Sequence, residues 1–440
     1  MNKINMLNPY QEQKKANYSP VKTLVYSLFS LLILGCGSLS AQTDRTAYID
    51  QAIEILESVP LFDGHNDVPW QYRNRVGYKF SELDFYDTTH LDRPMHTDIN
   101  RLREGRVGAQ WWSVYVSAAV PENEAVKQTL EQIDFVHRMI EKYPDHFELA
   151  LTADDVERIF AAGKIASLIG MEGGHSIANS LATLRMMYDL GARYMTITHN
   201  RTLDWADAAG DDPQHDGLTE FGEEVIREMN RLGMMVDLSH TTPATMKDAI
   251  RVSEAPIMFS HSNARALSGH PRNVPDDVLQ LTKENNGIVM VTFVETFTSE
   301  ERRVFFAERA AYQSKMQYLY PGEPDSVSLY MQQWDSEREA PKSTLEQVAD
   351  HIDHIRNQIG VDYIGIGGDY DGIPTLPLGL EDVTTYPDLF AELLARGYSD
   401  EDLRKIAGLN MLRVLRDAEE VSARLRSERG PSEVLITDFD

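Results

Sequence analysis

Histidines and carboxylates follow several apolar runs of this sequence, each at the point where the run ends. The segment LFDGHND, residues 61–67, passes from an apolar run directly into His65 and Asp67. Imidazole nitrogens and carboxylate oxygens without thiolates are typical ligands of a catalytic divalent metal. Five further runs end in the same way, with Glu172 in IGMEGGHS, His199 in MTITHN, His240 in VDLSH, His261 in MFSH and Asp369 in GIGGDYDG.

A divalent cation would relieve two problems that arise if these side chains meet. Gathered carboxylates repel one another, and buried neutral histidines need partners. Four or five ligands exceed the needs of one catalytic zinc ion, which predicts two ions roughly 3.5–4 Å apart with a bridging carboxylate. Glu172 is the expected bridge, and His65 with Asp67, two residues apart on an extended segment, can bind one ion together. Zinc, manganese and cobalt share such ligands, so the identity of the metal stays open.

The elements that would position these residues are short, continuous apolar runs separated by amphipathic stretches. Such runs are typical of buried parallel strands. Two of the amphipathic stretches close with a glycine shortly before the next strand, at Gly233 and Gly360. The predicted strands are 61–64, 109–116, 165–171, 194–198, 234–238, 256–260, 288–293 and 363–368.

Eight strand–helix units in series predict an α/β fold of the (β/α)8 TIM-like barrel type. A doubly wound sheet is the alternative architecture, because a sequence does not show whether a sheet closes. In a barrel, active sites lie at the carboxyl ends of the strands, where the histidines and carboxylates fall. By contrast, His351 and His354 lie three apart on a predicted helix, and we interpret them as residues of a solvated face.

The first 41 residues have the composition of an export signal. Basic residues precede an apolar run, Leu24 to Leu34, that is shorter than the ~20 residues a membrane span requires. Cys36 is the only cysteine and directly follows ILG, which resembles the bacterial lipoprotein signal. We therefore expect an exported protein, attached to a membrane through a lipidated Cys36. Plain cleavage after Ala41, giving a periplasmic or secreted protein, is the alternative.

The remaining chain is predicted to form one domain at 46–424, followed by a tail at 425–440. An insertion at about 298–343, between the last two strands, is expected to be partly helical and to lie over one barrel end. The net charge is −27, from 69 acidic and 42 basic residues. Because so acidic a surface repels phosphate backbones, nucleic-acid binding is not expected.

A series of longer motifs resembles the membrane (renal) dipeptidase family, from about residue 46 to 418. The resemblance implies a metal-dependent barrel that holds two zinc ions per chain, hydrolyses the peptide bond of dipeptides and forms a homodimer. The motifs, in order, are FDGHNDVPW, HTDINRLREGRVGAQWWSVY, IGMEGGHS, YMTITHNRTLDWADAA, MMVDLSHTT, IMFSHSNARAL, RNVPDDVL and IGIGGDYDGIPTLPLGLEDVTTYPDL.

The resemblance also implies roles for single residues. The ligands of the two zinc ions fall on His65 and Asp67, on the bridging Glu172, and on His240 and His261. His199 falls where the family steadies the tetrahedral intermediate, and Arg272 where it grips the terminal carboxylate of the substrate. The family's strand-eight aspartate falls on Asp369, with Asp371 as a competitor, and we expect this residue to take the proton of the attacking water and pass it to the leaving amine.

One departure concerns the substrate contact after strand seven. Animal members of the family often have a tyrosine there, whereas VTFVETF offers only Phe293, Val294 and Phe297. Two other functions remain open on the sequence alone. The first is another metal-dependent amidohydrolase reaction, such as cleavage of an N-acyl-D-amino acid or a lactam. The second is a non-catalytic zinc-binding protein that keeps the barrel.

Overall fold

The computed structural model describes residues 45–439, and within them eight parallel strands close into a barrel. Neighbouring strands follow the order β2-β1-β9-β8-β7-β6-β5-β4, and a pairing between β2 and β4 completes the circle. The predicted (β/α)8 barrel is therefore confirmed, and the doubly wound alternative is wrong. The barrel strands are β1 (Leu61–Asn66), β2 (Val107–Tyr115), β4 (Ile165–Glu172), β5 (Ala192–Thr196), β6 (Met235–Asp237), β7 (Met258–Phe259), β8 (Ile288–Val291) and β9 (Ile364–Ile366). A short strand outside the circle, β3 (Phe147–Leu149), pairs with the first residues of β4.

Each predicted strand has a counterpart, but several observed strands are shorter. The shortest is β7, which keeps only Met258–Phe259 of the predicted 256–260. The flanking amide groups bond to side chains instead of to a neighbouring strand. Ile257 donates its N–H to the Asn285 side chain, and Ser260 donates its N–H to the Asp237 carboxylate. These side chains end the ladder while leaving the backbone groups satisfied.

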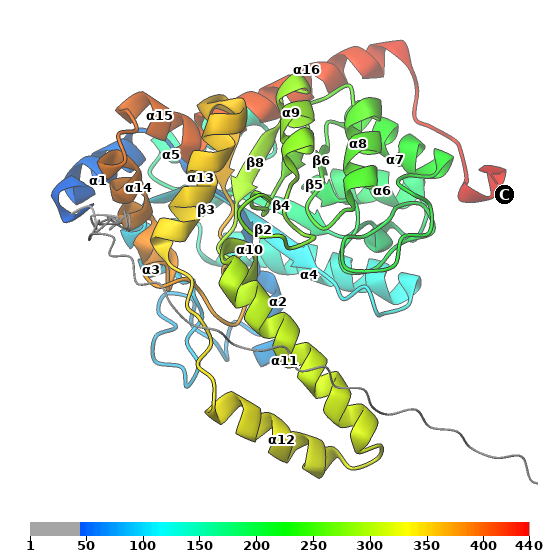
Figure 1. The fold of residues 1–440 in the computed structure, drawn as a ribbon. Coiled ribbons are helices and arrows are strands. Elements are labelled where there is room, and N and C mark those ends of the chain that lie inside the picture. The colour runs from blue at the N-terminus through cyan, green and yellow to red at the C-terminus, as the bar shows by residue number, and fades with distance from the viewer. Residues whose placement is uncertain (1–44, 440) are drawn as a thin grey trace, which may run out of the picture. The chain divides into compact units, whose positions relative to one another are not determined.

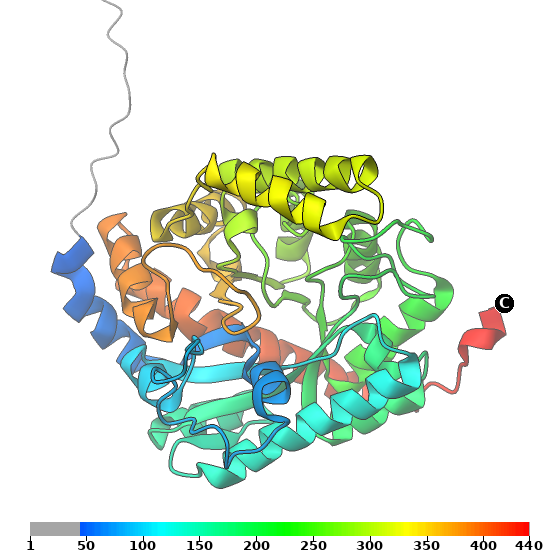
Figure 2. The ribbon, with the colours of Figure 1, turned by 90° about the horizontal axis from the view of Figure 1, so that it is seen from below.

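Helices surround the barrel, as Figures 1 and 2 show. Gly233 ends α7 in the left-handed conformation that glycine adopts at low cost, as the sequence predicts. Thr344 begins α13 with a reciprocal capping box to Gln347. The helices are α1 (Ile49–Ser58), α2 (Val68–Val76), α3 (Ile99–Glu104), α4 (Glu122–Lys142), α5 (Ala153–Ala161), α6 (Leu181–Asp189), α7 (Glu220–Leu232), α8 (Pro243–Val252), α9 (Asp276–Glu284), α10 (Glu295–Thr298), α11 (Glu300–Leu319), α12 (Pro324–Ser336), α13 (Leu345–Ile359), α14 (Tyr386–Ala395), α15 (Asp400–Arg404) and α16 (Asn410–Glu428).

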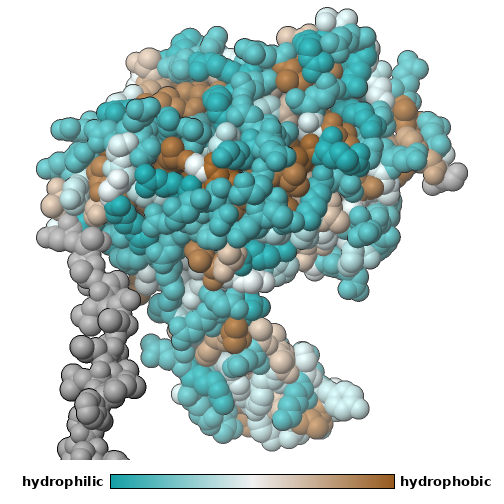
Figure 3. Space-filling model, turned by 45° about the horizontal axis from the view of Figure 1, so that its top comes forward, coloured by the Kyte–Doolittle hydropathy of each residue, from teal (hydrophilic) through white to brown (hydrophobic). Residues whose placement is uncertain are grey.

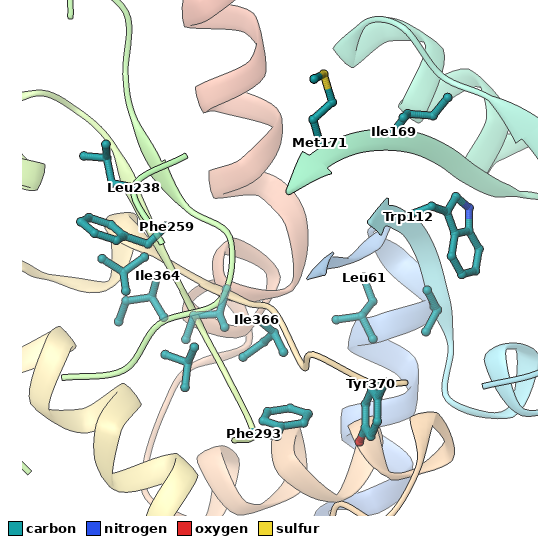
Figure 4. Close-up of a cluster of buried hydrophobic side chains, with 14 of the residues drawn as sticks. Leu61, Trp112, Ile169, Met171, Leu238, Phe259, Phe293, Ile364, Ile366 and Tyr370 are labelled. Atoms are coloured by element: carbon teal, nitrogen blue, oxygen red, sulfur yellow. The ribbon is translucent and has the colours of Figure 1, made fainter. Parts of the chain in front are cut away.

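The core has two layers that follow the alternation of side chains along each strand. Trp112, Ile169 and Phe259 belong to the cluster between strands and helices, part of which Figure 4 shows. Their sequence neighbours Trp111 and Leu168 belong to a second buried cluster. The barrel is thus a packed core, and only the end of the strands is available for a site.

The insertion between β8 and β9 is a helical hairpin. After α10, helix α11 runs outward and α12 packs back along it. Figures 1 and 2 show the hairpin projecting from the rim of the barrel, not lying over its end as expected. The surface shown in Figure 3 is predominantly hydrophilic over the barrel, in keeping with the net charge of −27.

The expectation of a solvated face for both α13 histidines is wrong for His351. This side chain is fully buried because α13 packs against the segments that follow β7 and β8. Its Nδ1 accepts the N–H of Ala264, and its Nε2 lies 3.0 Å from the carbonyl oxygen of Thr298. His354 is partly exposed and lies 2.8 Å from Asp276.

Among the described residues, none of the helices has the length and apolar content that crossing a membrane requires. The predicted leader and Cys36 lie outside the described residues.

Candidate metal centre

The residues that the sequence places at the ends of strands meet at the carboxyl end of the barrel. Their side chains form three overlapping groups whose candidate ligand atoms lie within 4.8 Å of one another. All of these residues are at least nine-tenths buried. The groups are His65 with Glu172 and His261, Glu172 with His199 and His240, and His65 with Asp67 and Asp369.

Glu172, the last residue of β4, lies at the centre of the cluster. Its Oε2 is 3.4 Å from the Nε2 of His65, and its Oε1 is 3.2 Å from the Nε2 of His240. The Nε2 atoms of His199 and His261 are each 3.7 Å from the same Oε1. One carboxylate therefore faces imidazoles on both sides, which is the arrangement that a bridging ligand requires.

His65 and Asp67 leave β1 on the same side of the cluster. The Nε2 of His65 is 3.3 Å from Asp67 Oδ2 and has no hydrogen-bond partner among the described residues. On the other edge of the ring, Nδ1 is 2.9 Å from the hydroxyl of Tyr194. The ring is thus held from behind while its Nε2 faces two carboxylates.

His240 and His261 are held in the same manner. The Nδ1 of His240 is 3.2 Å from Asn200 Oδ1, and the Nδ1 of His261 is 2.7 Å from Ser260 Oγ. Because Ser260 donates its hydroxyl hydrogen to Asp237, its oxygen is left to accept the Nδ1–H of His261. The two Nε2 atoms then both carry lone pairs, and they lie 3.0 Å apart.

This donor set fits a divalent metal. Facing lone pairs of two imidazoles repel each other, as do the carboxylates beside them, unless a cation lies between. Burial lowers the pKa of His240 and of His261 well below the usual range, so both rings are neutral and able to ligate at neutral pH. Burial alone would also lower the pKa of His65, but Tyr194, Glu172 and Asp67 raise it well above the usual value. A cation or a proton is therefore favoured between His65 and its carboxylates.

The two remaining titratable residues of the cluster have pKa values shifted in opposite directions. Burial, with nearby Arg272, lowers the pKa of His199 to about 4, so its ring is neutral. Burial and the neighbouring Asp67 and Glu172 carboxylates raise the pKa of Asp369 well above its usual range. Asp369 therefore binds a proton more readily than an ordinary carboxylate, which suits a residue that carries protons during a reaction.

Asp369, not Asp371, faces the cluster. The carboxylate of Asp371 accepts the backbone N–H of His96, and the backbone N–H of Asp371 reaches His96 Nδ1. Asp371 thereby fixes the loop after β9. Asp369 has a left-handed backbone, with φ of 61°, and its N–H donates to the carbonyl oxygen of His65.

A cavity of about 420 Å³ opens over the cluster. Arg272 lines it and is 4% exposed, and its Nε and Nη1 have no partner among the described residues. Burial lowers the pKa of Arg272 to about 10, which leaves the guanidinium charged at neutral pH. The apolar walls are Trp70, Tyr115, Pro271, Val294, Phe297 and Ile373.

The three apolar residues that the sequence offers after β8 divide between the cavity and the core. Val294 and Phe297 line the cavity, and the Arg272 guanidinium lies 5.3 Å from the centre of the Phe297 ring. Phe293 instead packs against Tyr370 and Tyr386, as Figure 4 shows for Tyr370. The wall at this position carries no hydroxyl group.

Several residues that hold the cluster have no chemical signature in the sequence. Tyr194, Asn200 and Ser260 contact the rear edges of the histidines. Asp237 accepts the hydroxyl hydrogen of Ser260, and Ser113 donates to Glu172 Oε2 at 3.2 Å. Ser260 and Asn200 directly adjoin His261 and His199, which is a weak signal. Tyr194 had none, because its partner is 129 residues away.

The comparisons with known proteins agree on one family. The model of the family "Membrane dipeptidase (Peptidase family M19)" matches residues 49–429. The chain is 40% identical over 389 residues to Dipeptidase verJ of Clonostachys rogersoniana, covering 86% of this chain and 89% of that protein.

Two solved structures are similar in fold. The probable dipeptidase PvdM from Pseudomonas aeruginosa has a TM-score of 0.74 at 24% identity, over 86% of this chain and 99% of that one. A metallo-peptidase from Rhodobacter sphaeroides, liganded with a phosphinate mimic of the dipeptide L-Ala-D-Ala, has a TM-score of 0.68 at 25% identity. That match covers 82% of this chain and 99% of that one.

Proposed function

Because the chain belongs to the membrane dipeptidase family, peptidase family M19, and is a metallo-dipeptidase, we propose that it uses two zinc ions to hydrolyse dipeptides. The observation that carries the proposal is the pair of imidazole groups on either side of Glu172. His65 with Asp67 lies near one carboxylate oxygen, and His240 with His261 lies near the other.

Each half of the cluster would hold one ion. His65 and Asp67 would bind the first, His240 and His261 the second, and Glu172 would bridge them. Zinc ions at these positions supply Lewis acidity, which makes water nucleophilic near neutral pH and polarises the scissile carbonyl. Because the cluster is buried, little water is present to screen these electrostatic interactions, which are therefore stronger than in solution.

Two further residues would handle protons and charge. The neutral His199 ring adjoins Glu172 and can donate one N–H to the oxygen that gains negative charge during attack. Asp369, with its raised pKa, would accept the proton of the attacking water and deliver it to the amine that leaves.

Arg272 would select substrates that end in a free carboxylate. Its planar guanidinium can bind two carboxylate oxygens at once, and its buried Nε and Nη1 have no such partner among residues 45–439. A clamp in the wall of a cavity of about 420 Å³ favours a dipeptide over a longer chain, whose carboxylate would lie too far from the scissile bond. The dipeptide mimic bound by the Rhodobacter sphaeroides relative supports the same substrate class.

The test is hydrolysis of a panel of dipeptides by the purified protein, with and without a chelator. Each dipeptide is paired with its C-terminal amide, which keeps the scissile bond but lacks the carboxylate. We expect turnover of the acids, at least ~100-fold lower kcat/KM for the amides, and loss of both with chelator. Equal turnover of acids and amides would favour a different amidohydrolase reaction, and no turnover with zinc bound would favour a non-catalytic protein.

We also propose export and homodimerisation. Export is supported by the basic and apolar composition of residues 1–41, with Cys36 as the lipidated residue, and the homodimer is supported by the family alone. Mass spectrometry of the mature N-terminus would distinguish a lipidated Cys36 from cleavage after Ala41, and light scattering would give the mass in solution.

A further inference from the structure

Tyr194 reaches the metal cluster from inside the barrel. It lies on β5 and is fully buried, and its ring centre lies 4.8 Å from that of Trp111 of β2, with the two ring planes tilted by 50°. Its hydroxyl oxygen is 2.9 Å from the Nδ1 of His65 and 3.4 Å from the carbonyl oxygen of Gly64. The side chain therefore crosses from β5 to the end of β1, beneath the cluster.

Gly170 provides the space for this crossing. In the β4–β5 register Gly170 pairs with Tyr194, and a Cβ atom on Gly170 would lie 2.0 Å from the Cζ atom of the tyrosine ring. Any side chain at residue 170 would displace the ring and with it the hydroxyl. The glycine and the tyrosine thus act as a pair.

A bound cation would fix which ring nitrogen of His65 carries the proton. The Nε2 of His65 must then offer its lone pair, so Nδ1 must carry the proton and needs a buried acceptor. The Tyr194 oxygen is the acceptor within reach, and its own hydrogen is directed to Gly64.

We propose that Tyr194 is a positioning residue of the metal centre: its hydroxyl holds His65 protonated at Nδ1 and turns the Nε2 lone pair toward Asp67 and Glu172. This inference rests on the proposed zinc function. It assigns a separate support to each half of the cluster, since Ser260 and Asp237 hold His261 by a different route.

The first experiment measures zinc affinity of the metal-free protein by competition with a chromogenic chelator. Tyr194→Phe removes one oxygen atom and keeps the ring. We expect one of two zinc ions to bind roughly 10–100-fold more weakly, the range that supporting residues of metal ligands show. Ser260→Ala should weaken binding of the other zinc ion, because Ser260 contacts His261. Circular dichroism and thermal melting of the metal-free proteins check that the fold is retained.

Tyr72→Phe is the matched control. Tyr72 is also fully buried, and its hydroxyl donates to the carbonyl oxygen of Leu83, away from the cluster. This variant should bind both ions with wild-type affinity. Wild-type affinity for both ions in Tyr194→Phe would overturn the inference, as would an equal loss in Tyr72→Phe.

A second measurement uses the unaltered zinc-loaded protein, so it holds even if Tyr194→Phe fails to fold. Nitrogen-15 spectra of labelled histidines, with His65 assigned from the signal lost in His65→Gln, report which ring nitrogen carries hydrogen. We expect a proton on Nδ1 of His65, and a proton on Nε2 would overturn the inference. If the wild-type protein binds no zinc at all, the proposed function fails instead, which separates the two results.

Discussion

Arg272 is a buried, charged side chain of the cavity that lacks hydrogen-bond partners for part of its guanidinium within residues 45–439. The guanidinium of Arg272 is 4% exposed, and its Nε and Nη1 have no hydrogen-bond partner among the described residues. Its loss of hydration is therefore not compensated by hydrogen bonds to those residues. The nearby carboxylates of Asp369 and Glu172 favour its charged form, but burial still lowers its pKa to about 10. Such a group is stabilised when a ligand carboxylate arrives.

Substituting Arg272 therefore tests substrate binding. Arg272→Ala should raise KM for dipeptides enough to reduce kcat/KM by roughly 100-fold or more, because a buried, charge-assisted pair is lost. Arg272→Lys keeps the charge but not the planar fork, and an intermediate loss is expected. Steady-state kinetics on a dipeptide and its amide check this. An unchanged KM in Arg272→Ala would refute the clamp.

The metal cluster could be anticipated from the sequence because each member ends a strand. Their convergence followed from one regularity, the common end of parallel strands in a barrel. The competition between Asp369 and Asp371 could not be resolved in the same way. The outcome depends on which of the two carboxylates accepts the backbone N–H of His96. His96 lies 275 residues from Asp371 in the chain. Tyr194 was hidden for the same reason.

Helix α13 stabilises the mouth of the barrel through His351. The ring joins the loop after β7, at Ala264, to the end of α10, at Thr298. Both of those segments precede or include cavity residues. The sequence placed His351 on a solvated face because the helical period alone does not reveal what packs against it.

The buried His351 predicts a loss of stability in acid. Burial lowers its pKa to about 4, against about 6.5 in an unfolded chain. Between these values the unfolded state binds the proton more tightly, so stability falls as the pH falls from 6.5 toward 4. The contribution is about 2 kcal/mol between pH 7.5 and 5.

Urea unfolding of the wild type and of His351→Gln at pH 7.5 and 5 measures this contribution to the free energy of unfolding. Glutamine does not titrate, so the variant should lose about 2 kcal/mol less on acidification than the wild type. Other buried histidines act equally in both proteins and cancel in the comparison. An identical loss in both would show that His351 does not titrate on unfolding.

The base of the α11–α12 hairpin is held by a buried ion pair. Arg302 lies 2.5 Å from Glu295 of α10 and donates to the carbonyl oxygen of Pro341, where the chain returns. Because Val294 and Phe297 of the same segment line the cavity, the pair connects the hairpin to the substrate site.

Breaking one partner of this pair should cost more than replacing both. Arg302→Ala leaves the buried Glu295 without its counterion, with only the Ser343 hydroxyl donating to it, and should cost about 3–5 kcal/mol. Glu295→Gln combined with Arg302→Met should cost clearly less. Urea unfolding of both variants gives the free energies. We also expect Arg302→Ala to raise KM as α10 loosens. If the double variant is as unstable as the single one, the buried charge is not the cause.

For the whole molecule, the sequence predicted the barrel and its strand order well, since each strand is a short apolar run with its own turn signals. Closure was the part it could not establish. That property depends on the β2–β4 pairing, between Ala109 and Ala166 onward, which skips β3 altogether. The course of the hairpin was likewise set by packing at its base and not by its own composition.

The central claim is that the cluster around Glu172 binds two cations. A zinc titration of the protein, after a chelator has removed its metal, tests this most directly. Dipeptidase activity and bound zinc are measured on the same samples as zinc is added per chain. We predict that activity is absent without metal and reaches its maximum only as the second ion binds. Full activity in the presence of chelator, or a plateau at one ion or fewer per chain, would contradict the account.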